Sequence, residues 1–508
     1  MAGEVLKVNR SALFFLIIFS LLSIHLTFAS DSPLIYLKAV GVSTLDPGLT
    51  TDTYSSEVIS NIFDGLVRYK KTSTGVEPSL ALKWSVDSEG KRWIFQLRKG
   101  VKFHNGKEFN AGSVVFNFRT RILHKKKYSN WNRLNSHIYS IGSLDDYTVE
   151  IILNKPFVPF LNSLASPKHM IVEPSSYKSG DFSPIGTGPF KLSENNPEKY
   201  TSIVRNDNYW DGEVRIPKII FKIVDDVAWR IIQLKSGKAS MLMVHSSKEY
   251  EELRGRRELR LLTVPSVSVH YLAFNTQKGI FQNRNVRLAF SHLINKAPLI
   301  DRIFQNFAKN ATTPIPRGIF GFNPDIKDSE FDIVKARNLL KLGSIKDGER
   351  VSLYYSGNSK PLGEIAAVIK KFAAKAGIHV YAVPLSFADL RKAVRNKRHD
   401  MVMMGWSGDI PDPDVFLYGT FADAKSEFNR SGYSDPELTN LLEDARKTIN
   451  IIERKKKYYR AQEIIARDCP WIPLYNMNDI IVANTNIKDL HINQLSYVIF
   501  KDAYVERN

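Results

Sequence analysis

The hydrophobic run that stands out most clearly in the chain covers residues 400–404, and glycine, proline and aspartate follow it at once. Asp400-Met401-Val402-Met403-Met404 is apolar without strict alternation, which is typical of a short buried strand. It leads into Gly405-Trp406-Ser407-Gly408-Asp409. Ligands of open α/β sheets bind outside the carboxyl ends of the strands. We therefore expect residues 406–409 to lie at the rim of a ligand crevice, with Asp409 facing a cationic group.

Taken alone, the same segment also fits a solvated turn beside a tryptophan in the core. The residues after Asp409 alternate between proline and aspartate, as Pro411-Asp412-Pro413-Asp414, and this composition favours a turn. On either interpretation we expect Asp412 and Asp414 to be turn residues that tolerate replacement by asparagine.

Periodicity predicts further elements in both halves of the chain. Alternation predicts strands, and apolar residues at i, i+3, i+4 and i+7 predict amphipathic helices. The Asn105-Gly106 pair is a strong turn signal, so we expect the segment before it to pair with the preceding strand. The predicted strands cover residues 34–41, 93–98, 101–104, 266–274 and 480–483, and the predicted helices cover 54–69 and 111–121. This mixture indicates an α/β protein.

The N-terminal residues have the pattern of a secretory signal peptide. Lys7 and Arg10 precede an apolar run from Ala12 to Leu26, and small residues surround Ala29. The alternative is an uncleaved anchor, but the apolar run is short for a membrane span. A lipid-anchored protein would carry cysteine after the cleavage position, where this chain has Ser30. We expect residues 1–29 to be a signal peptide and the protein to be periplasmic without a lipid anchor.

Composition narrows the function classes. The 508 residues suffice for two or three domains, and the single cysteine, Cys469, excludes a disulfide-stapled scaffold; we expect it to be buried and inert. The net charge of +19 becomes about +18 without Lys7, Arg10 and Glu4. A charge of this sign suggests nucleic acid or an anionic membrane as a partner. The basic runs are separate, so we expect solvated faces and no nucleic acid. Attraction to anionic surfaces stays open.

Motifs for catalysis are absent from the sequence. It contains no His-Glu-x-x-His helix, no Gly-x-Ser-x-Gly elbow and no phosphate-binding Gly-Lys-Ser/Thr loop, and its histidines are scattered. We expect no enzyme activity, no catalytic residues, no metal site and no cofactor.

Several motifs cover nearly the whole mature chain and include Leu45-Asp46-Pro47, the residues 93–106, Gly186-Thr187-Gly188-Pro189-Phe190, Asn208-Tyr209-Trp210-Asp211-Gly212, Leu272-Ala273-Phe274-Asn275-Thr276 and Cys469-Pro470-Trp471-Ile472-Pro473. Taken in this order, they resemble the extracytoplasmic solute-binding proteins of peptide and nickel ABC transporters, which form solute-binding protein family 5.

The resemblance implies an α/β, two-lobe periplasmic binding protein fold of type II, in the large peptide-binding class with an extra subdomain. Lobe 1 would comprise residues 30–270 plus 480–508, with the subdomain at about 57–180, and lobe 2 residues 271–479. The implied function is capture of oligopeptides for an inner-membrane ABC permease and its ATPases by a monomer. The alternatives are another cargo in the same fold (a metal chelate, haem, an opine or a sugar) or a binding protein retooled for surface interaction.

The resemblance also implies site residues. Asp409 matches the aspartate that pairs with the ligand amino group in peptide-binding relatives, and Trp406, Ser407 and Gly408 would form a wall beside it. The loop Asp52-Thr53-Tyr54 would face the crevice from lobe 1. Ser356 stands where dipeptide-specific relatives carry an arginine for the ligand carboxylate. A serine cannot make that bidentate contact, so we expect tolerance of longer or modified peptides.

Overall fold

The computed structural model describes residues 32–506, except residues 72, 125, 129–133, 135, 178–181 and 494. The predicted signal peptide lies outside the described residues. No described helix combines the length and the apolar composition that a membrane crossing requires.

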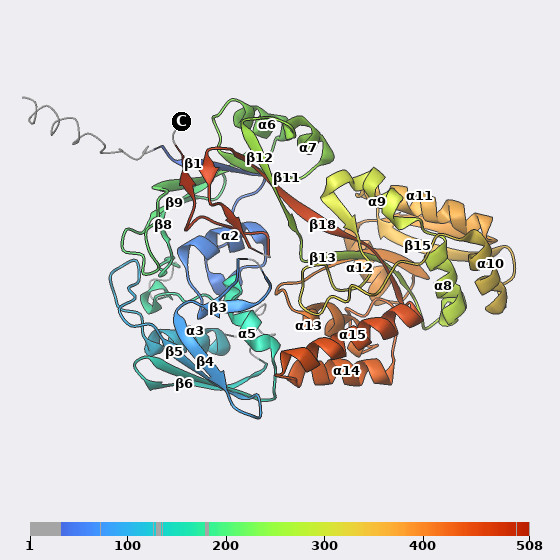
Figure 1. The fold of residues 1–508 in the computed structure, drawn as a ribbon, viewed down its shortest axis with the longest axis horizontal. Helices are drawn as coiled ribbons and strands as arrows, with labels where there is room; N and C mark the ends of the chain where they lie inside the picture. Colours follow the sequence, from blue (N-terminus) through green and yellow to red (C-terminus); the bar gives the residue numbers. More distant parts are fainter. Residues whose placement is uncertain are drawn as a thin grey trace, which may run out of the picture.

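The molecule consists of two lobes that share one long mixed sheet (Figure 1). The strand order is β16-β15-β17-β13-β18-β11-β1-β10-β9-β8, and β12 and β14 also pair with β18. Its strands are β1 (Leu34–Lys38), β8 (Phe190–Asn196), β9 (Tyr200–Arg205), β10 (Lys218–Ile223), β11 (Met241–Val244), β12 (Leu259–Pro265), β13 (Ser268–Phe274), β14 (Ala308–Asn310), β15 (Glu349–Ser356), β16 (Ile378–Leu385), β17 (Met401–Ser407) and β18 (Trp471–Asn484).

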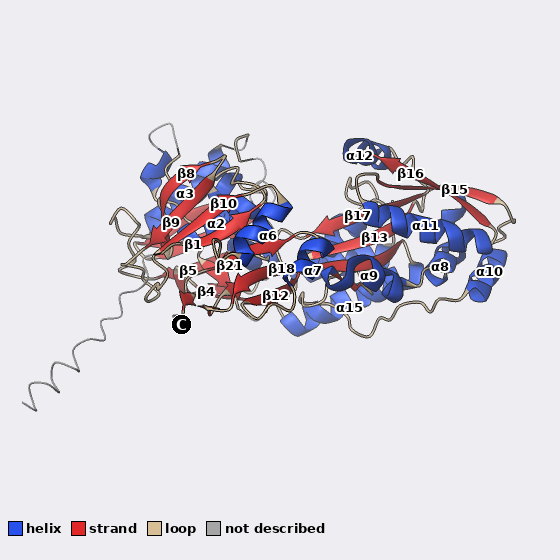
Figure 2. Ribbon diagram, turned by 90° about the horizontal axis from the view of Figure 1, so that it is seen from above, coloured by secondary structure: helices blue, strands red, loops and turns tan. Residues whose placement is uncertain are grey.

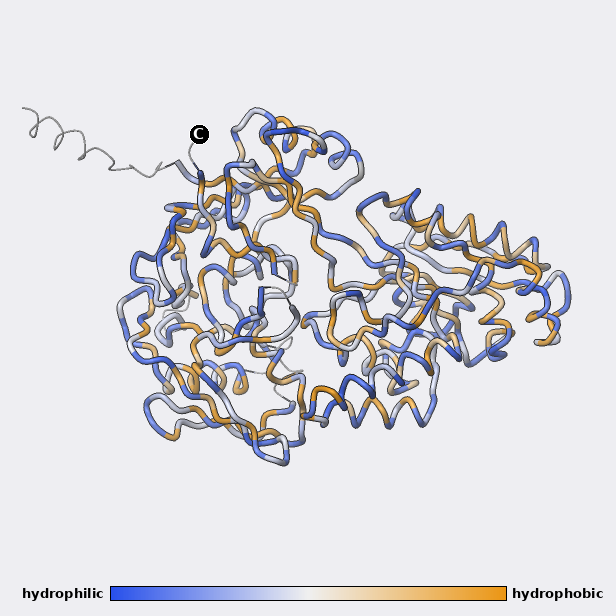
Figure 3. The backbone as a smooth tube through the Cα atoms, in the orientation of Figure 1, coloured by the Kyte–Doolittle hydropathy of each residue, from blue (hydrophilic) through white to orange (hydrophobic). Residues whose placement is uncertain are grey.

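Strand β18 runs from one lobe into the other. Its first part pairs with β13, and its second part pairs with β12 and β11, all antiparallel. The predicted connecting strands at residues 266–274 and 480–483 are thus confirmed, although β18 is much longer than expected. Apolar residues occupy both ends of β18, whereas its middle, Asn476-Met477-Asn478-Asp479, is mainly polar. The tube between the lobes accordingly has both orange and blue stretches (Figure 3).

The lower part of lobe 1 carries a separate antiparallel sheet of order β4-β5-β7-β6, covered by α3 (Ala111–Leu123) (Figure 1). Its strands are β4 (Ala81–Val86), β5 (Arg92–Leu97), β6 (Ile138–Asp145) and β7 (Thr148–Leu153). The prediction that residues 101–104 pair with β5 is wrong. Strands β4 and β7 occupy both edges of β5, so this segment only closes a small turn through the Lys102–Glu108 bridge.

The helix predicted at 54–69 is shorter than expected. Helix α2 (Thr53–Ile62) ends before Asp64, and the chain re-enters extended structure as β2 (Val67–Tyr69), paired with β3 (Val76–Pro78). The buried Asp64 carboxylate accepts hydrogen bonds from Thr187, Tyr209 and Trp210. These tertiary contacts outweigh the helical spacing of residues 63–67.

Helices surround the strands of lobe 2 (Figure 2). Helix α11 packs on β15 and β16, and α14 packs along α15. Besides α2, the α-helices that the structure describes in the two lobes are α3 (Ala111–Leu123), α5 (Pro159–Leu164), α6 (Val227–Lys235), α7 (Ser247–Leu253), α8 (Arg284–His292), α9 (Lys296–Phe304), α10 (Ile333–Leu342), α11 (Lys360–Lys375), α12 (Phe387–Arg395), α13 (Pro413–Leu417), α14 (Pro436–Lys447) and α15 (Ile451–Asp468).

One apolar core continues from the lobe 1 subdomain into lobe 2. It joins Phe95 and Ile151 of the subdomain sheet to Phe416, Leu442 and Ile464 around α13–α15. The two lobes are therefore packed against each other along this side of the molecule.

Candidate ligand-binding site

Three strands from the two lobes end at one cavity of about 300 Å³. Strand β1 ends at Lys38, β11 leads into His245, and β17 ends at Ser407, so the cavity lies at their carboxyl ends, where ligands of such sheets bind. Its volume is at the lower end of the range for small-molecule sites. The lining residues are Lys38, Thr53, Tyr54, Met243, His245, Ser266, Val267, Ser407, Gly408, Asp479, Leu495, Ser496 and Tyr497.

Four of the predicted site residues line this cavity together. Thr53 and Tyr54 approach it from the start of α2, and Ser407 and Gly408 approach it from the end of β17. The Gly408 amide donates to the Val267 carbonyl at 2.8 Å. A Cβ at Gly408 would lie 2.8 Å from the Phe416 ring, so only glycine fits this close approach.

The other predicted residues have different positions. Asp52 is the N-cap of α2 and accepts the Ser55 amide at 2.7 Å, which orients Thr53 and Tyr54. Trp406 is half-buried; its indole donates to the Val415 carbonyl at 2.8 Å, and its ring meets Phe428 edge-on. Ser356 ends β15, next to β17, at the same edge of the sheet. Asp52, Trp406 and Ser356 are not among the residues that line the cavity, and their roles stay predictions.

Asp409 follows the cavity wall and forms an ion pair between the lobes. The Lys168 ammonium, next to α5, lies 3.4 Å from the Asp409 carboxylate. The two side chains are 21% and 43% exposed, respectively, and border a small recess of about 30 Å³ next to Gly408. A ligand ammonium that approached Asp409 would therefore meet a resident ammonium.

The expectation that Asp412 and Asp414 are solvated turn residues is wrong, because both carboxylates are buried. Asp412 pairs with Arg454 and also accepts the side-chain amide of Asn162 across the lobes at 3.1 Å. Asp414 lies 2.9 Å from Arg446. Burial alone would lower the pKa of the Arg454 guanidinium, but Asp412 raises it above the ordinary value. The prolines here begin α13 rather than form an exposed turn.

Sequence reasoning missed a buried ion pair in the cavity wall. The Lys38 ammonium contacts the Glu57 carboxylate, and the side chains are 5% and 1% exposed. The ammonium also lies 3.8 Å from the centre of the Tyr36 ring. Burial lowers the pKa of Lys38, and Glu57 opposes that shift. The charge of Lys38 is thus already neutralised within the wall.

Asp479, on the crossing strand β18, is the second residue that sequence reasoning missed. Its carboxylate accepts hydrogen bonds from the Ser496 and Ser266 hydroxyls. Burial raises its pKa, and the serine contacts and His245 oppose the shift. Burial lowers the pKa of His245, which keeps that imidazole neutral at pH 7. The available signal was a single charge at the start of the apolar sequence Ile480-Ile481-Val482.

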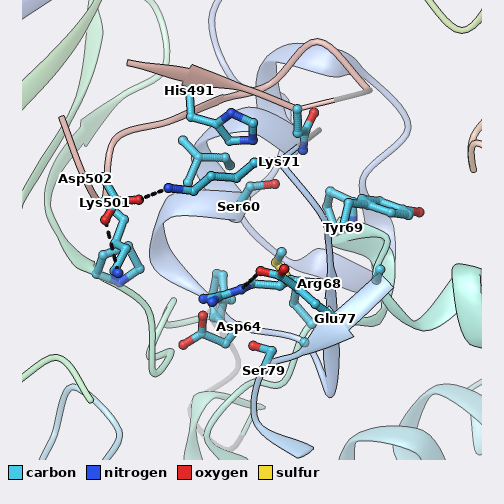
Figure 4. Close-up of a pocket in the computed structure, with 18 of the residues that line it drawn as sticks. Ser60, Asp64, Arg68, Tyr69, Lys71, Glu77, Ser79, His491, Lys501 and Asp502 are labelled. Atoms are coloured by element: carbon cyan, nitrogen blue, oxygen red, sulfur yellow. Dashed lines mark hydrogen bonds and ion pairs between the residues drawn. The ribbon is translucent and has the colours of Figure 1, made fainter. Parts of the chain in front are cut away.

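A second cavity, of about 220 Å³, lies within lobe 1 below the C-terminal strands (Figure 4). Asp64 lines this cavity and accepts the three hydrogen bonds described above. The other aspartate, glutamate, lysine and arginine side chains of its lining pair in an alternating chain that also includes Asp211. The chain runs Glu77–Arg68–Asp211–Lys501–Asp502–Lys71. The interlobe cavity is the better ligand site, because it lies at the strand ends and contains predicted residues.

The described residues contain no group of three or more histidine, cysteine, aspartate or glutamate side chains that could hold a metal ion. Cys469 is buried, as predicted, and burial raises its thiol pKa to about 12.

The chain matches the model for bacterial extracellular solute-binding proteins, family 5, over residues 75–428. It therefore belongs to this family. A heme-binding protein A of Haemophilus influenzae is 30% identical to this family 5 protein, over 88% of this chain and 87% of its own. A dipeptide-binding protein of Escherichia coli is 28% identical, over 93% of this chain and 94% of its own.

Solved structures agree with this assignment. The binding protein DppA of Helicobacter pylori, in complex with the peptide STSA, superposes with a TM-score of 0.76 at 30% identity, covering 94% of this chain and 98% of that one. The predicted α/β two-lobe periplasmic binding protein fold is thus confirmed for this family 5 protein.

Proposed function

We propose that this family 5 protein captures short peptides between its lobes and delivers them to an inner-membrane ABC permease with its ATPases. The interlobe cavity carries the proposal, because Thr53, Tyr54, Ser407 and Gly408 meet there from both lobes. The names of the E. coli and H. pylori relatives favour a peptide cargo. The volume of about 300 Å³ favours the short end of the oligopeptide range.

In this proposal the cargo amino group binds the Asp409 carboxylate after displacing Lys168. The pair is partly exposed and 3.4 Å long, so little free energy holds it together. Trp406 supports the end of β17, and Ser356 leaves the cargo carboxylate without a bidentate clamp. The protein acts as a monomer without enzymatic activity.

Native mass spectrometry of the purified protein with its co-bound ligand tests the function. A bound mass that fragments as a peptide supports it, and calorimetry with di-, tri- and pentapeptides, free and amidated, then ranks cargo length. A dipeptide-only profile that requires a free carboxylate would contradict the role given to Ser356. A bound haem would instead favour the cargo named for the H. influenzae relative.

We also propose the lobe boundaries and the export route given by the sequence. Lobe 1 comprises residues 30–270 and 480–508, with a subdomain at about 57–180, and lobe 2 comprises residues 271–479. Residues 1–29 are removed as a signal peptide and leave no lipid anchor. N-terminal sequencing of protein from the periplasmic fraction tests this: a chain that begins at Met1 contradicts cleavage.

A further inference from the structure

The interlobe cavity contains a carboxylate, that of Asp479, which forms no ion pair with the part of the chain that the structure describes. Asp479 is mostly buried, lines the cavity and accepts hydrogen bonds from serine hydroxyls. Among the described residues, no lysine, arginine or histidine nitrogen lies within ion-pair distance of its carboxylate. A desolvated charge is costly unless an opposite charge and hydrogen bonds compensate for it. The cavity wall thus holds one carboxylate that no cationic side chain of the described residues pairs.

The other charged groups around the cavity do not supply that compensation. The positive charge of Lys38 is bound to Glu57, and the His245 imidazole is neutral at pH 7. Asp52, beside the cavity, adds a further carboxylate that is held by Ser43, Ser55 and the α2 amide. The site is therefore negative in a chain whose net charge is +19. The overall composition therefore does not account for the negative charge of this cavity.

We propose that Asp479 binds a cationic side chain of the cargo, and that this protein selects short peptides that contain lysine or arginine. The inference rests on the proposed peptide-binding function and adds the class of peptide. An ammonium or guanidinium group would form charge-assisted hydrogen bonds with the carboxylate. Met243, Val267 and Leu495 line the same cavity and suit the methylene stem of such a side chain. Tyr54 and Tyr497 also line the cavity, and aromatic rings attract cations; the Lys38 ammonium already lies 5.5 Å from the centre of the Tyr54 ring.

The position of Asp479 links this recognition to both lobes. Asp479 lies on β18 opposite Val264 of β12, where the chain crosses between the lobes. Ser407, the last residue of β17, and Gly408, which follows it, line the same cavity. A cation at Asp479 is thus enclosed by residues of both lobes, which reduces its screening by solvent.

Calorimetry on the mature protein tests the proposal with two series of tripeptides. One series places a single lysine at each position of trialanine, and the other places norleucine there, which keeps the stem and removes the ammonium. We expect at least one lysine peptide to bind the parent tenfold or more tightly than its norleucine counterpart. Equal affinities would overturn the inference and leave the proposed function intact. Failure of every peptide to bind would overturn both.

Two variants assign the preference to Asp479. In Asp479→Asn the lysine preference should fall to within threefold, whereas affinity for norleucine peptides should stay within threefold of the parent. Asp479→Ser is the second variant if the first does not fold. The matched control, Asp207→Asn, removes a carboxylate that is 74% exposed and should keep the full preference. A lysine preference that survives both Asp479 changes would overturn the assignment.

Discussion

The Asp412 carboxylate accepts two hydrogen bonds from the Arg454 guanidinium, at 3.0 and 2.7 Å, and both side chains are buried. Because Asp412 also accepts from Asn162 of α5, this pair connects α15 to the facing lobe. The contact lies three residues beyond Asp409 but has a different role. It joins the lobes through a buried ion pair, whereas the Asp409–Lys168 pair is partly exposed.

We predict that Asp412→Asn lowers the free energy of unfolding by about 3–5 kcal/mol, since it leaves the Arg454 charge buried without its partner. Urea unfolding followed by circular dichroism measures the change. Asp207→Asn, which breaks an exposed pair with Arg205, should cost no more than about 1 kcal/mol. If Asp412→Asn also lowers the free energy of unfolding by no more than about 1 kcal/mol, the Arg454 guanidinium is solvated and this prediction is wrong.

For Asp409→Asn we predict nearly unchanged stability without ligand, because the carboxylate is 43% exposed and its pair with Lys168 is 3.4 Å long. Affinity for a free-amine peptide should fall by about one to two decades, since a hydrogen bond to a charged group contributes about 1.5–3 kcal/mol. Calorimetry with free and N-acetylated forms of one peptide measures this. An unchanged preference for the free amine would exclude Asp409 as the amino-group partner.

The prediction for Lys168→Met is a gain of affinity. A cargo ammonium must displace the Lys168 ammonium from Asp409, and an exposed pair of this kind is worth about 0.2–1 kcal/mol. Its removal should strengthen binding of free-amine peptides by a factor of about 1.5 to 5 and leave N-acetylated peptides unaffected. Weaker binding of the free-amine peptides would indicate that Lys168 contacts the cargo itself.

Some of the contacts behind these predictions could be predicted from the sequence, and others could not. Local pattern sufficed to predict β17, because the apolar residues 401–404 lead into a glycine-rich end. It also sufficed for Gly408, where a Cβ would collide with the Phe416 ring. The motif order was enough to indicate the two-lobe fold. Local pattern failed at Asp412 and Asp414, whose proline neighbours favour a turn. Their partners, Arg454 and Arg446, lie more than thirty residues away, and only the tertiary fold buries them together.

The cavity wall shows the same limit. Lys38 ends a strand and Glu57 lies inside α2, and neither position signals an ion pair in sequence. Asp479 lies more than two hundred residues from Ser266, with which it shares the wall. Long-range pairing of β18 with β12 brings these two residues together. The side chains that the crossing strands contribute were therefore not predicted. Thr53 and Tyr54 were predicted, but from the family resemblance rather than from local pattern.

We finally predict that Asp479→Asn stabilises the ligand-free protein at neutral pH while it weakens binding of cationic peptides. Burial raises the pKa of Asp479 in the folded state above the unfolded value of about 3.9. Between these two values the folded state holds a proton that the unfolded state has lost. The stability that comes from the neutral acid is complete below the unfolded pKa and is lost as pH rises through the folded pKa. Asparagine carries no charge at any pH, so the variant escapes this loss.

The melting temperatures of variant and parent should therefore be similar near pH 4 and diverge towards pH 8, with the variant higher. His245 titrates in both proteins, in the opposite sense because its folded pKa is lowered, so the comparison with the parent largely removes its contribution. Asp207→Asn should show no gap that grows with pH. Saturation with a lysine peptide should raise the melting temperature of the parent more than that of the variant, by mass action. A variant that is less stable than the parent at pH 8 would show that the Asp479 carboxylate is compensated within the protein, and its proposed role in binding a cationic cargo would then fail.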